Sequence, residues 1–154
     1  MVDHLGTSPD DVQFRFRDDE MADHATVTVD ACCDQTNATA VRIEPGDDAR
    51  VLLPFLDRLA LVEVNFPAYT DGRGYSAARI LREAGYTGEL RAVGDVLIDQ
   101  LSHMRRCGFD AFAPDTPLDE EDAARAFATW ENVYQHAFDT HEGKRRTIIE
   151  KRHG

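Results

Sequence analysis

Short apolar runs alternate with longer amphipathic segments through the middle of the chain. The short runs are rich in β-branched, aromatic and leucine residues and are followed closely by Pro, Gly or Asp, which is typical of strands. The segments between them repeat apolar residues at helical spacing, so each has one face suited to burial. We therefore predict strands joined by helices, with the strands at residues 40–44, 61–66, 89–93 and 109–112.

Each predicted helix has a residue suited to its N-terminus. Asp47 is expected to cap the first helix, which Pro54 should kink or split. Ser76 is expected to cap the second, Asp95 to open the third and Asp115 to cap the fourth. The expected core-facing positions are Val51, Leu52, Phe55, Leu56 and Leu59; Ala77, Ile80, Leu81 and Ala84; Leu97, Leu101 and Met104; and Ala123, Phe127, Trp130 and Tyr134.

The N-terminal third has a different pattern. Residues 12–17 and 26–29 alternate apolar and polar side chains, as half-buried strands do. We interpret the polar run between them as a hairpin loop, so these two strands are expected to pair with each other.

Strands that alternate with helices predict an α/β fold: βα repeats on a mainly parallel sheet. Two architectures fit, half of a (βα)8 barrel and an open doubly wound sheet, and in both the ligand lies at the carboxyl ends of the strands. We expect one domain over residues 1–139, with residues 1–39 as its N-terminal strands, and a flexible basic tail at residues 140–154. Four βα units leave a sheet edge or face uncovered, so we also expect a homodimer or a stable partner protein.

The net charge of −12 is concentrated outside the central segment. Residues 1–60 contribute −8 and residues 114–139 contribute −6, whereas residues 61–113 contribute only −1. Acidic flanks oppose binding to nucleic acid or to anionic membranes, which need clustered positive charge. The sequence also has neither an apolar run of the ~20 residues that span a bilayer nor an N-terminal secretory pattern. We therefore expect a cytoplasmic protein that binds neither nucleic acid nor membrane.

The loop before the second predicted helix is the richest candidate for a site. Two glycines allow close approach of a ligand to the backbone, and the helix that follows directs N–H groups outward. The guanidinium of Arg73 adds a contact suited to a carboxylate, phosphate or sulfur oxyanion. The sequence thus predicts an anion site, although a tight turn before a capped helix explains the same residues. The predicted anion-binding residues are Gly72, Arg73, Gly74, Tyr75 and Ser76.

Two carboxylates are candidates for catalysis. Asp71 lies in the same loop and Asp95 follows the next strand, so the fold would bring both to one edge of the sheet. Either is a candidate general base, and an N-cap is the simpler role for Asp95. The two arginines of the second predicted helix, Arg79 and Arg82, fall on its polar side and are expected to be solvated.

Cysteine and histidine positions do not predict a metal site. The three cysteines, Cys32, Cys33 and Cys107, are odd in number and are expected to be reduced, with Cys107 packed. No histidine pairs with a cysteine at the spacing of a structural zinc site. His103 is expected to pair at the surface with Asp99, four residues before it.

Three stretches of the central segment resemble one protein family. They are FPAYTDGRGYSAARILR, GELRAVGDVLIDQL and RRCGFDAF, and they are similar to the proteobacterial domain-of-unknown-function family 934. The resemblance covers residues 59 to about 112 closely and the terminal helix with Tyr134-Gln135 more loosely. Residues 1–39 match poorly.

The resemblance also implies a function. Members of that family are usually described as probable oxidoreductases involved in sulfite reduction, which implies an accessory protein that acts with the proteins of assimilatory sulfite reduction. The sequence has no flavin or nicotinamide fingerprint and no cysteine set for an iron–sulfur cluster or sirohaem. We therefore expect no cofactor, and whether the chain is an enzyme stays open. The alternative is a small enzyme or ligand-binding domain with an anion site at the strand ends.

Overall fold

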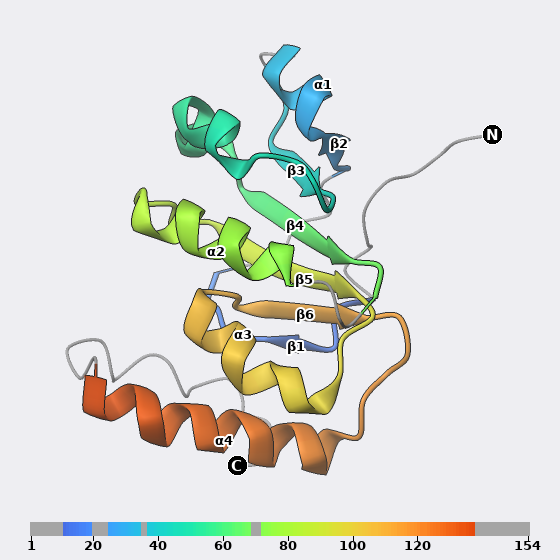
Figure 1. Ribbon diagram of the computed structural model, residues 1–154, viewed down its shortest axis with the longest axis vertical. Coiled ribbons are helices and arrows are strands. Elements are labelled where there is room, and N and C mark those ends of the chain that lie inside the picture. Colours follow the sequence, from blue (N-terminus) through green and yellow to red (C-terminus); the bar gives the residue numbers. More distant parts are fainter. Residues whose placement is uncertain (1–10, 20–24, 35–36, 69–71, 138–154) are drawn as a thin grey trace.

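A six-stranded sheet forms the centre of the molecule (Figure 1). The computed structural model describes residues 11–19, 25–34, 37–68 and 72–137, with side chains up to residue 129. The strand order is β1-β6-β5-β4-β3-β2, and all neighbours are parallel except β1 and β6. The strands are β1 Phe14–Arg15, β2 Val27–Thr28, β3 Ala40–Ile43, β4 Leu61–Phe66, β5 Glu89–Gly94 and β6 Ala111–Pro114. The predicted parallel pairing of the four central strands is confirmed.

Helices follow most of the strands. They are α1 Val29–Asp34, the 3₁₀ helix η2 Ala49–Arg58, α2 Arg73–Glu83, the short 3₁₀ turn η3 Ile98–Gln100, α3 Leu101–Cys107 and α4 Glu120–Ala137. Among the residues described, no helix has the length and apolar character needed to cross a bilayer.

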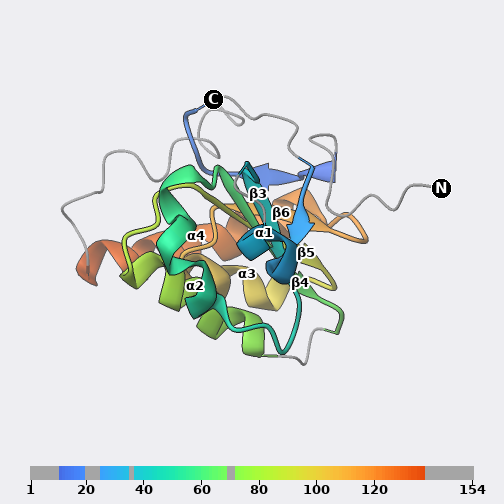
Figure 2. The same cartoon turned by 90° about the horizontal axis from the view of Figure 1, so that it is seen from above.

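The strand order decides between the two predicted architectures. From β2 to β6 the order rises without a reversal, so successive connections step in one direction and leave their helices on one face. Figure 2 shows α2 and α3 together on one side of the sheet. A doubly wound sheet reverses its strand order at a switch point. The chain therefore has the open, half-barrel-like arrangement of successive βα units.

The hydrophobic core lies between the sheet and the helices. Alternate strand positions face the helices, and the register partners Val41, Val62 and Leu90 are all fully buried there. The helices contribute a matching set of fully or almost fully buried side chains, Leu52, Ala77, Leu81, Leu101, Met104, Ala123 and Phe127, all of which were predicted. Each large apolar side chain buried in this layer stabilises the fold by about 1.5–3 kcal/mol.

Five predicted core positions differ or fall outside the description. Val51 and Leu97 are 42% and 37% exposed, and Ala84, at the end of α2, is also exposed. The side chains of Trp130 and Tyr134 lie outside the described residues. Leu97 misses the core because the segment after β5 stays extended at that residue, and α3 begins only at Leu101.

The opposite face of the sheet carries charged side chains. Arg42, Glu63 and Arg91 are register partners on β3, β4 and β5, and the last two are 0% and 2% exposed. Arg42 Nη1 lies 3.6 Å from Glu63 Oε1, and Arg91 Nη1 lies 3.4 Å from Glu63 Oε2. Arg91 also binds Glu89, with Nη2 2.8 Å from Oε2. Buried charges persist only when they are paired, so this row is a structural ion network.

The predicted N-terminal hairpin is wrong. β1 and β2 lie at opposite edges of the sheet, where β1 pairs antiparallel with β6 and β2 pairs parallel with β3. The side chain of Gln13 helps to fix β1 at its edge, because Nε2 donates to the carbonyl of Leu118 at 2.7 Å and Oε1 accepts from the Leu118 amide at 2.9 Å. The alternating pattern identified both strands but carried no information about their partners.

The predicted helix caps are displaced along the chain. Asp48 caps η2 by accepting from the Arg50 amide, while Asp47 accepts from the Glu44 amide and closes the preceding turn. Pro54 does not split this helix, which continues from Ala49 to Arg58 as a 3₁₀ helix. In α4 the carboxylate of Asp119, rather than Asp115, accepts from the amide of Asp122. In both helices an Asp further along the chain than the predicted one takes the capping role.

Candidate functional site

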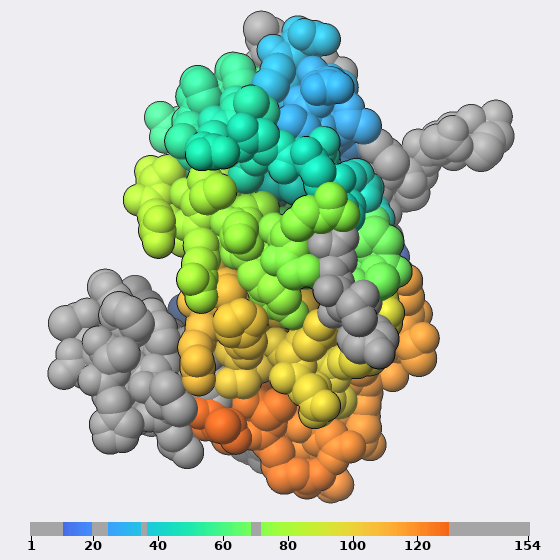
Figure 3. Space-filling model, viewed as in Figure 1, coloured from blue at the N-terminus to red at the C-terminus, as the bar shows by residue number. Residues whose placement is uncertain are grey.

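A groove runs between the start of η2 and the first turns of α2, at the carboxyl ends of β3 and β4. Its volume is about 380 Å³, and its lining residues are Gly46, Asp47, Asp48, Ala49, Arg50, Arg73, Ser76, Ala77 and Ile80. A smaller pocket beside it is lined by Ile43, Glu44, Pro45, Gly46, Asp47, Val64, Asn65, Arg73, Gly74 and Ala77. Figure 3 looks onto this helix-covered face, with η2 in teal and α2 in green. This is the edge of the sheet at which parallel α/β proteins bind ligands.

The turn between β3 and η2 is held by its own hydrogen bonds. The Asp47 amide donates to the Glu44 carbonyl at 3.0 Å, and the Glu44 amide donates to Asp47 Oδ2 at 2.8 Å. Gly46 has a φ of +94°, a conformation that other residues rarely adopt. The turn is therefore a fixed wall of the groove.

Two arginines contribute guanidinium groups to the groove from different elements. Arg73 begins α2, and a Cβ atom added to Gly46 would lie 3.9 Å from Arg73 Nη1, so this guanidinium lies against the turn. Arg50 lies on η2, where its Nε is 3.1 Å from Asp48 Oδ1, and its side chain is 70% exposed. The backbone amide and guanidinium of Arg50 hold the pKa of Asp48 below its usual range.

Gly74 explains why α2 starts so close to the sheet. A Cβ atom at this position would lie 2.6 Å from the Phe66 ring and 2.8 Å from Val64 Cγ1. Only glycine lets the first turn of α2 pack directly on the carboxyl end of β4. The N-cap of α2 is Gly72, which offers no side chain to the first amides of the helix.

The carboxylate of Glu44 is oriented by two donors, one on β3 and one on β4. Asn65 Nδ2 donates to Oε1 at 2.8 Å, and Arg42 Nε donates to Oε2 at 3.0 Å. Arg42 also approaches Glu63, so Glu44 is the end of the ion network that crosses the sheet. The Glu44 side chain keeps 45% of its surface exposed.

The predicted anion-binding residues divide into two groups. Arg73 and Ser76 line the groove, and Gly74 lines the pocket beside it. Tyr75 instead packs between Phe66 and His103, with ring centroids 5.4 Å and 4.7 Å away, and burial raises the pKa of its hydroxyl. Ser76 is not the N-cap of α2, because the helix already begins at Arg73.

Of the two predicted catalytic carboxylates, the structure describes Asp95 alone, so their juxtaposition stays a prediction. Asp71 lies outside the described residues. The Asp95 amide donates to the carbonyl of Phe66 at 2.7 Å, which joins the ends of β4 and β5, and Asp95 does not line the groove described above. Gly94 has a φ of +98°, and a Cβ there would lie 2.5 Å from the Phe66 carbonyl oxygen. Asp95 does not cap a helix, since Leu97 precedes η3.

Two other predictions about α2 and α3 are corrected. Arg82 is not a solvated side chain: it donates to the carbonyls of Tyr86, Gly88 and Gly108, and its Nη2 lies 3.0 Å from Asp110 Oδ2. The contacts of His103 are with Tyr75 and with Cys107, whose Sγ lies 3.8 Å from Nε2, rather than with Asp99. Burial, together with the charges of Arg79 and Arg106, lowers the pKa of His103.

The cysteines are reduced and two of them are packed. Cys32 and Cys107 are buried, Cys33 is exposed, and all three are free thiols. Burial raises the pKa of Cys32. No group of three His, Cys, Asp or Glu side chains in the described part of the chain is arranged to hold a metal ion.

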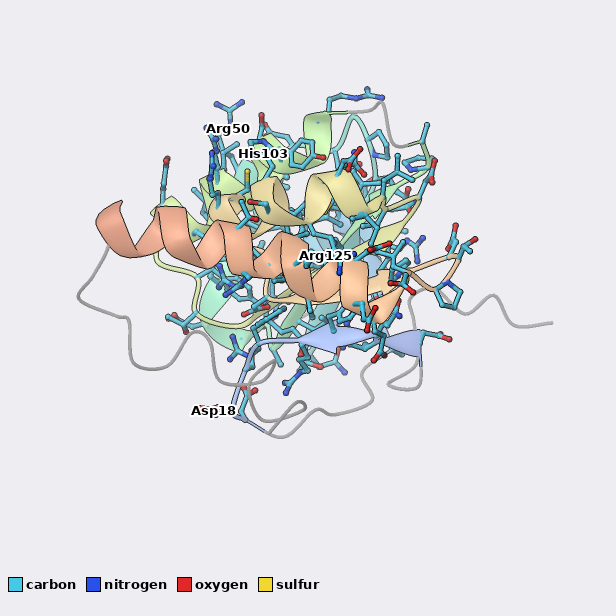
Figure 4. All side chains as sticks on the ribbon, turned by 90° about the horizontal axis from the view of Figure 1, so that it is seen from below. Asp18, Arg50, His103 and Arg125 are labelled. Atoms are coloured by element: carbon cyan, nitrogen blue, oxygen red, sulfur yellow. The ribbon has the colours of Figure 1, made fainter. Side chains whose placement is uncertain are left out.

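The sequence analysis missed the β3 side of the groove. Glu44, Asp47, Asp48 and Arg50 were considered only as strand, turn and helix residues. The signal was present, since EPGDDAR follows directly on a predicted strand and its residues therefore belong at the ligand-binding edge of a parallel sheet. Figure 4 shows Arg50 and His103 on the helix-covered side of the sheet and Asp18 on the other side.

Comparison with known proteins identifies one family. The profile of a bacterial family of proteins of unknown function, DUF934, matches residues 40–144. The match includes β3 to β6, the turn after β3 and the whole of α2 and α3. No curated protein and no solved structure shows significant similarity to the chain.

Proposed function

The chain belongs to the bacterial DUF934 family of unknown function, and we propose that it binds a small ligand through an anionic group at the carboxyl ends of β3 and β4. Arg73 is the main side-chain contact, Arg50 a second cation, and Ser76 a hydroxyl donor. One observation carries this proposal: arginines from two separate elements, η2 and α2, line the same groove.

The arrangement of the backbone supports the same function. The close packing of Gly74 on Phe66 fixes the start of α2, and the Asp47–Glu44 hydrogen bonds fix the facing turn. A ligand would therefore meet walls whose positions are set before it binds, which reduces the entropy lost on binding. The apolar side chains of Ala49, Ala77 and Ile80 add contact area for the uncharged part of the ligand.

Calorimetric titration with sulfate, phosphate and sulfite at low salt tests the proposal. A charge-assisted contact is worth about 1.5–3 kcal/mol, so Arg73→Ala should weaken binding roughly ten- to a hundred-fold. Arg79→Ala is the matched control, because Arg79 is exposed on the same helix but does not line the groove. Absence of saturable binding in the wild type, or equal binding by Arg73→Ala, would refute the anion site.

A second candidate function is an accessory role beside the proteins of assimilatory sulfite reduction. The support for it is the resemblance of the central segment to a family described in those terms, together with the family membership. Co-purification from native cells, read by mass spectrometry and absorbance, tests it. A stoichiometric sulfite-reduction protein in the eluate supports the accessory role, whereas a bound chromophore without such a protein supports an enzyme.

A further inference from the structure

One side of α2 lines the groove over two helical turns. The lining residues that α2 contributes are Arg73, Ser76, Ala77 and Ile80. Their spacing of three and four residues along the chain places them on the same side of the helix. From Arg73 to Ile80 the helix rises by about 10 Å, at about 1.5 Å per residue. The groove therefore continues along α2 beyond the space that a compact inorganic anion at Arg73 would fill.

Three of the lining side chains are aliphatic and come from both helices. Ala49 on η2 and Ala77 on α2 are 2% and 6% exposed, and the Ile80 side chain is half-buried. The two helices contact each other and lie side by side (Figure 1). Because an alanine side chain ends at Cβ, the groove reaches close to the helix backbones at Ala49 and Ala77. Methylene groups placed against these side chains would leave water, which favours binding.

The charged residues of the lining favour a ligand with a single negative charge. They are Arg50 and Arg73 together with Asp47 and Asp48. Both carboxylates are held by their own segment, since Asp47 accepts from the Glu44 amide and Asp48 accepts from the amide and side chain of Arg50. The Coulomb energy scales with the product of the charges, so a dianion would meet more repulsion from these carboxylates than a monoanion. A carboxylate or a sulfonate therefore suits the groove better than a phosphate dianion.

We propose that the ligand is an aliphatic monoanion, with its carboxylate or sulfonate on Arg73 and its alkyl chain along α2 toward Ile80. The inference rests on the proposed function and adds the class of ligand to it. An extended alkyl chain advances about 1.3 Å per carbon, because its bonds of about 1.5 Å run in a zigzag. The distance of about 10 Å along α2 therefore accommodates an acid of roughly six to eight carbons.

A series of straight-chain carboxylates tests the alkyl chain without changing the protein. Acetate, butanoate, hexanoate and octanoate share one head group and differ only in length. Each buried methylene should raise the affinity about two- to fourfold, so calorimetry should show hexanoate binding at least about tenfold more tightly than acetate. Equal affinities across the series, or binding of sulfate alone, would overturn the aliphatic ligand and leave the anion site standing. Absence of saturable binding by all four carboxylates and by sulfate would refute both.

Two variants and a probe of opposite charge then locate the chain and the head group. Ile80→Ser should reduce the gain from acetate to hexanoate by at least about threefold, whereas Arg73→Ala should weaken every member of the series. Val51→Ser is the matched control, because Val51 is an exposed aliphatic residue of η2 that does not line the groove. Hexylammonium should bind at least about tenfold more weakly than hexanoate. Equal binding of hexylammonium, or a gain that persists in full in Ile80→Ser, would contradict the assignment.

Discussion

Arg91 and Glu63 face each other as register partners on β5 and β4, with Nη1 of Arg91 3.4 Å from Oε2 of Glu63. They are almost completely buried on the face of the sheet opposite the helices. Glu89 and Arg42 extend the contact on either side. The network therefore joins three parallel strands through charged side chains.

Arg91→Met should destabilise the protein strongly. The substitution keeps a long side chain but leaves Glu63 and Glu89 with one cation fewer in a buried environment, which typically costs about 3–5 kcal/mol. Arg125→Met is the control, because Arg125 is 71% exposed in a surface pair with Asp122, and such pairs contribute about 0–1 kcal/mol. Urea unfolding followed by circular dichroism measures both. Equal midpoints for the two variants would show that the network does not stabilise the fold.

Gly94→Ala should cost more stability than Gly85→Ala. Both glycines have a positive φ, +98° and +101°, so alanine is strained at either position by about 1–2 kcal/mol. Only at Gly94 would the new Cβ also collide with the Phe66 carbonyl oxygen, whereas nothing lies within 4 Å at Gly85. Thermal unfolding of the two variants gives the difference. A smaller loss of stability at Gly94 would mean that the ends of β4 and β5 shift at little cost to accommodate the new Cβ atom.

Acid should weaken the contact of Asp19 with Arg17 and Arg15. The hydrogen bond from Arg17 is the main cause that lowers the pKa of Asp19 from 3.8 to about 2. Because the folded pKa is below the unfolded one, the contribution to stability is complete above about pH 4 and is lost as the pH falls toward 2. Asp19→Asn should flatten the decrease of the unfolding free energy in this window. Since Asp19 is 54% exposed, 1 M salt should reduce the difference; an identical acid profile in the variant would contradict the pairing.

A homodimer stays a prediction. The sheet is open, with β1 and β2 as its two edge strands, and proteins seldom leave such edges accessible to other chains. Sedimentation equilibrium at micromolar concentration should therefore give about twice the mass of one chain. A single species at the monomer mass would contradict the dimer and would show that these short edges need no partner.

The sequence predicted those parts of the fold that depend on local periodicity. The strands at residues 61–66 and 89–93, their parallel pairing, and the buried face of α2 around Leu81 followed from apolar spacing. The placement of β1 and β2 at opposite edges did not, because it depends on contacts distant in the sequence, such as that of Gln13 with Leu118. The pairing of Arg91 with Glu63 also joins residues that are far apart in the chain, so local periodicity could not predict it.

The candidate site, too, depends on contacts between residues that are distant in the sequence. Arg73 was predicted from the chemistry of one loop, whereas its approach to Gly46 required β3 and β4 to be neighbours. The expectation that Arg82 is solvated was wrong because its helical position gave only the direction of the side chain, and the neighbouring elements determined its contacts.

Chemical-shift mapping of the backbone amides is the most direct test of the central claim that Arg73 and the groove around it bind an anionic group. Titration of ¹⁵N-labelled protein with sulfate at low salt should shift the amides of residues 44–50 and 73–77 along one saturable curve. In Arg73→Ala these shifts should disappear at the same concentrations, while Arg79→Ala should reproduce the wild type. Shifts that are absent, that do not saturate, or that persist unchanged in Arg73→Ala would contradict the account.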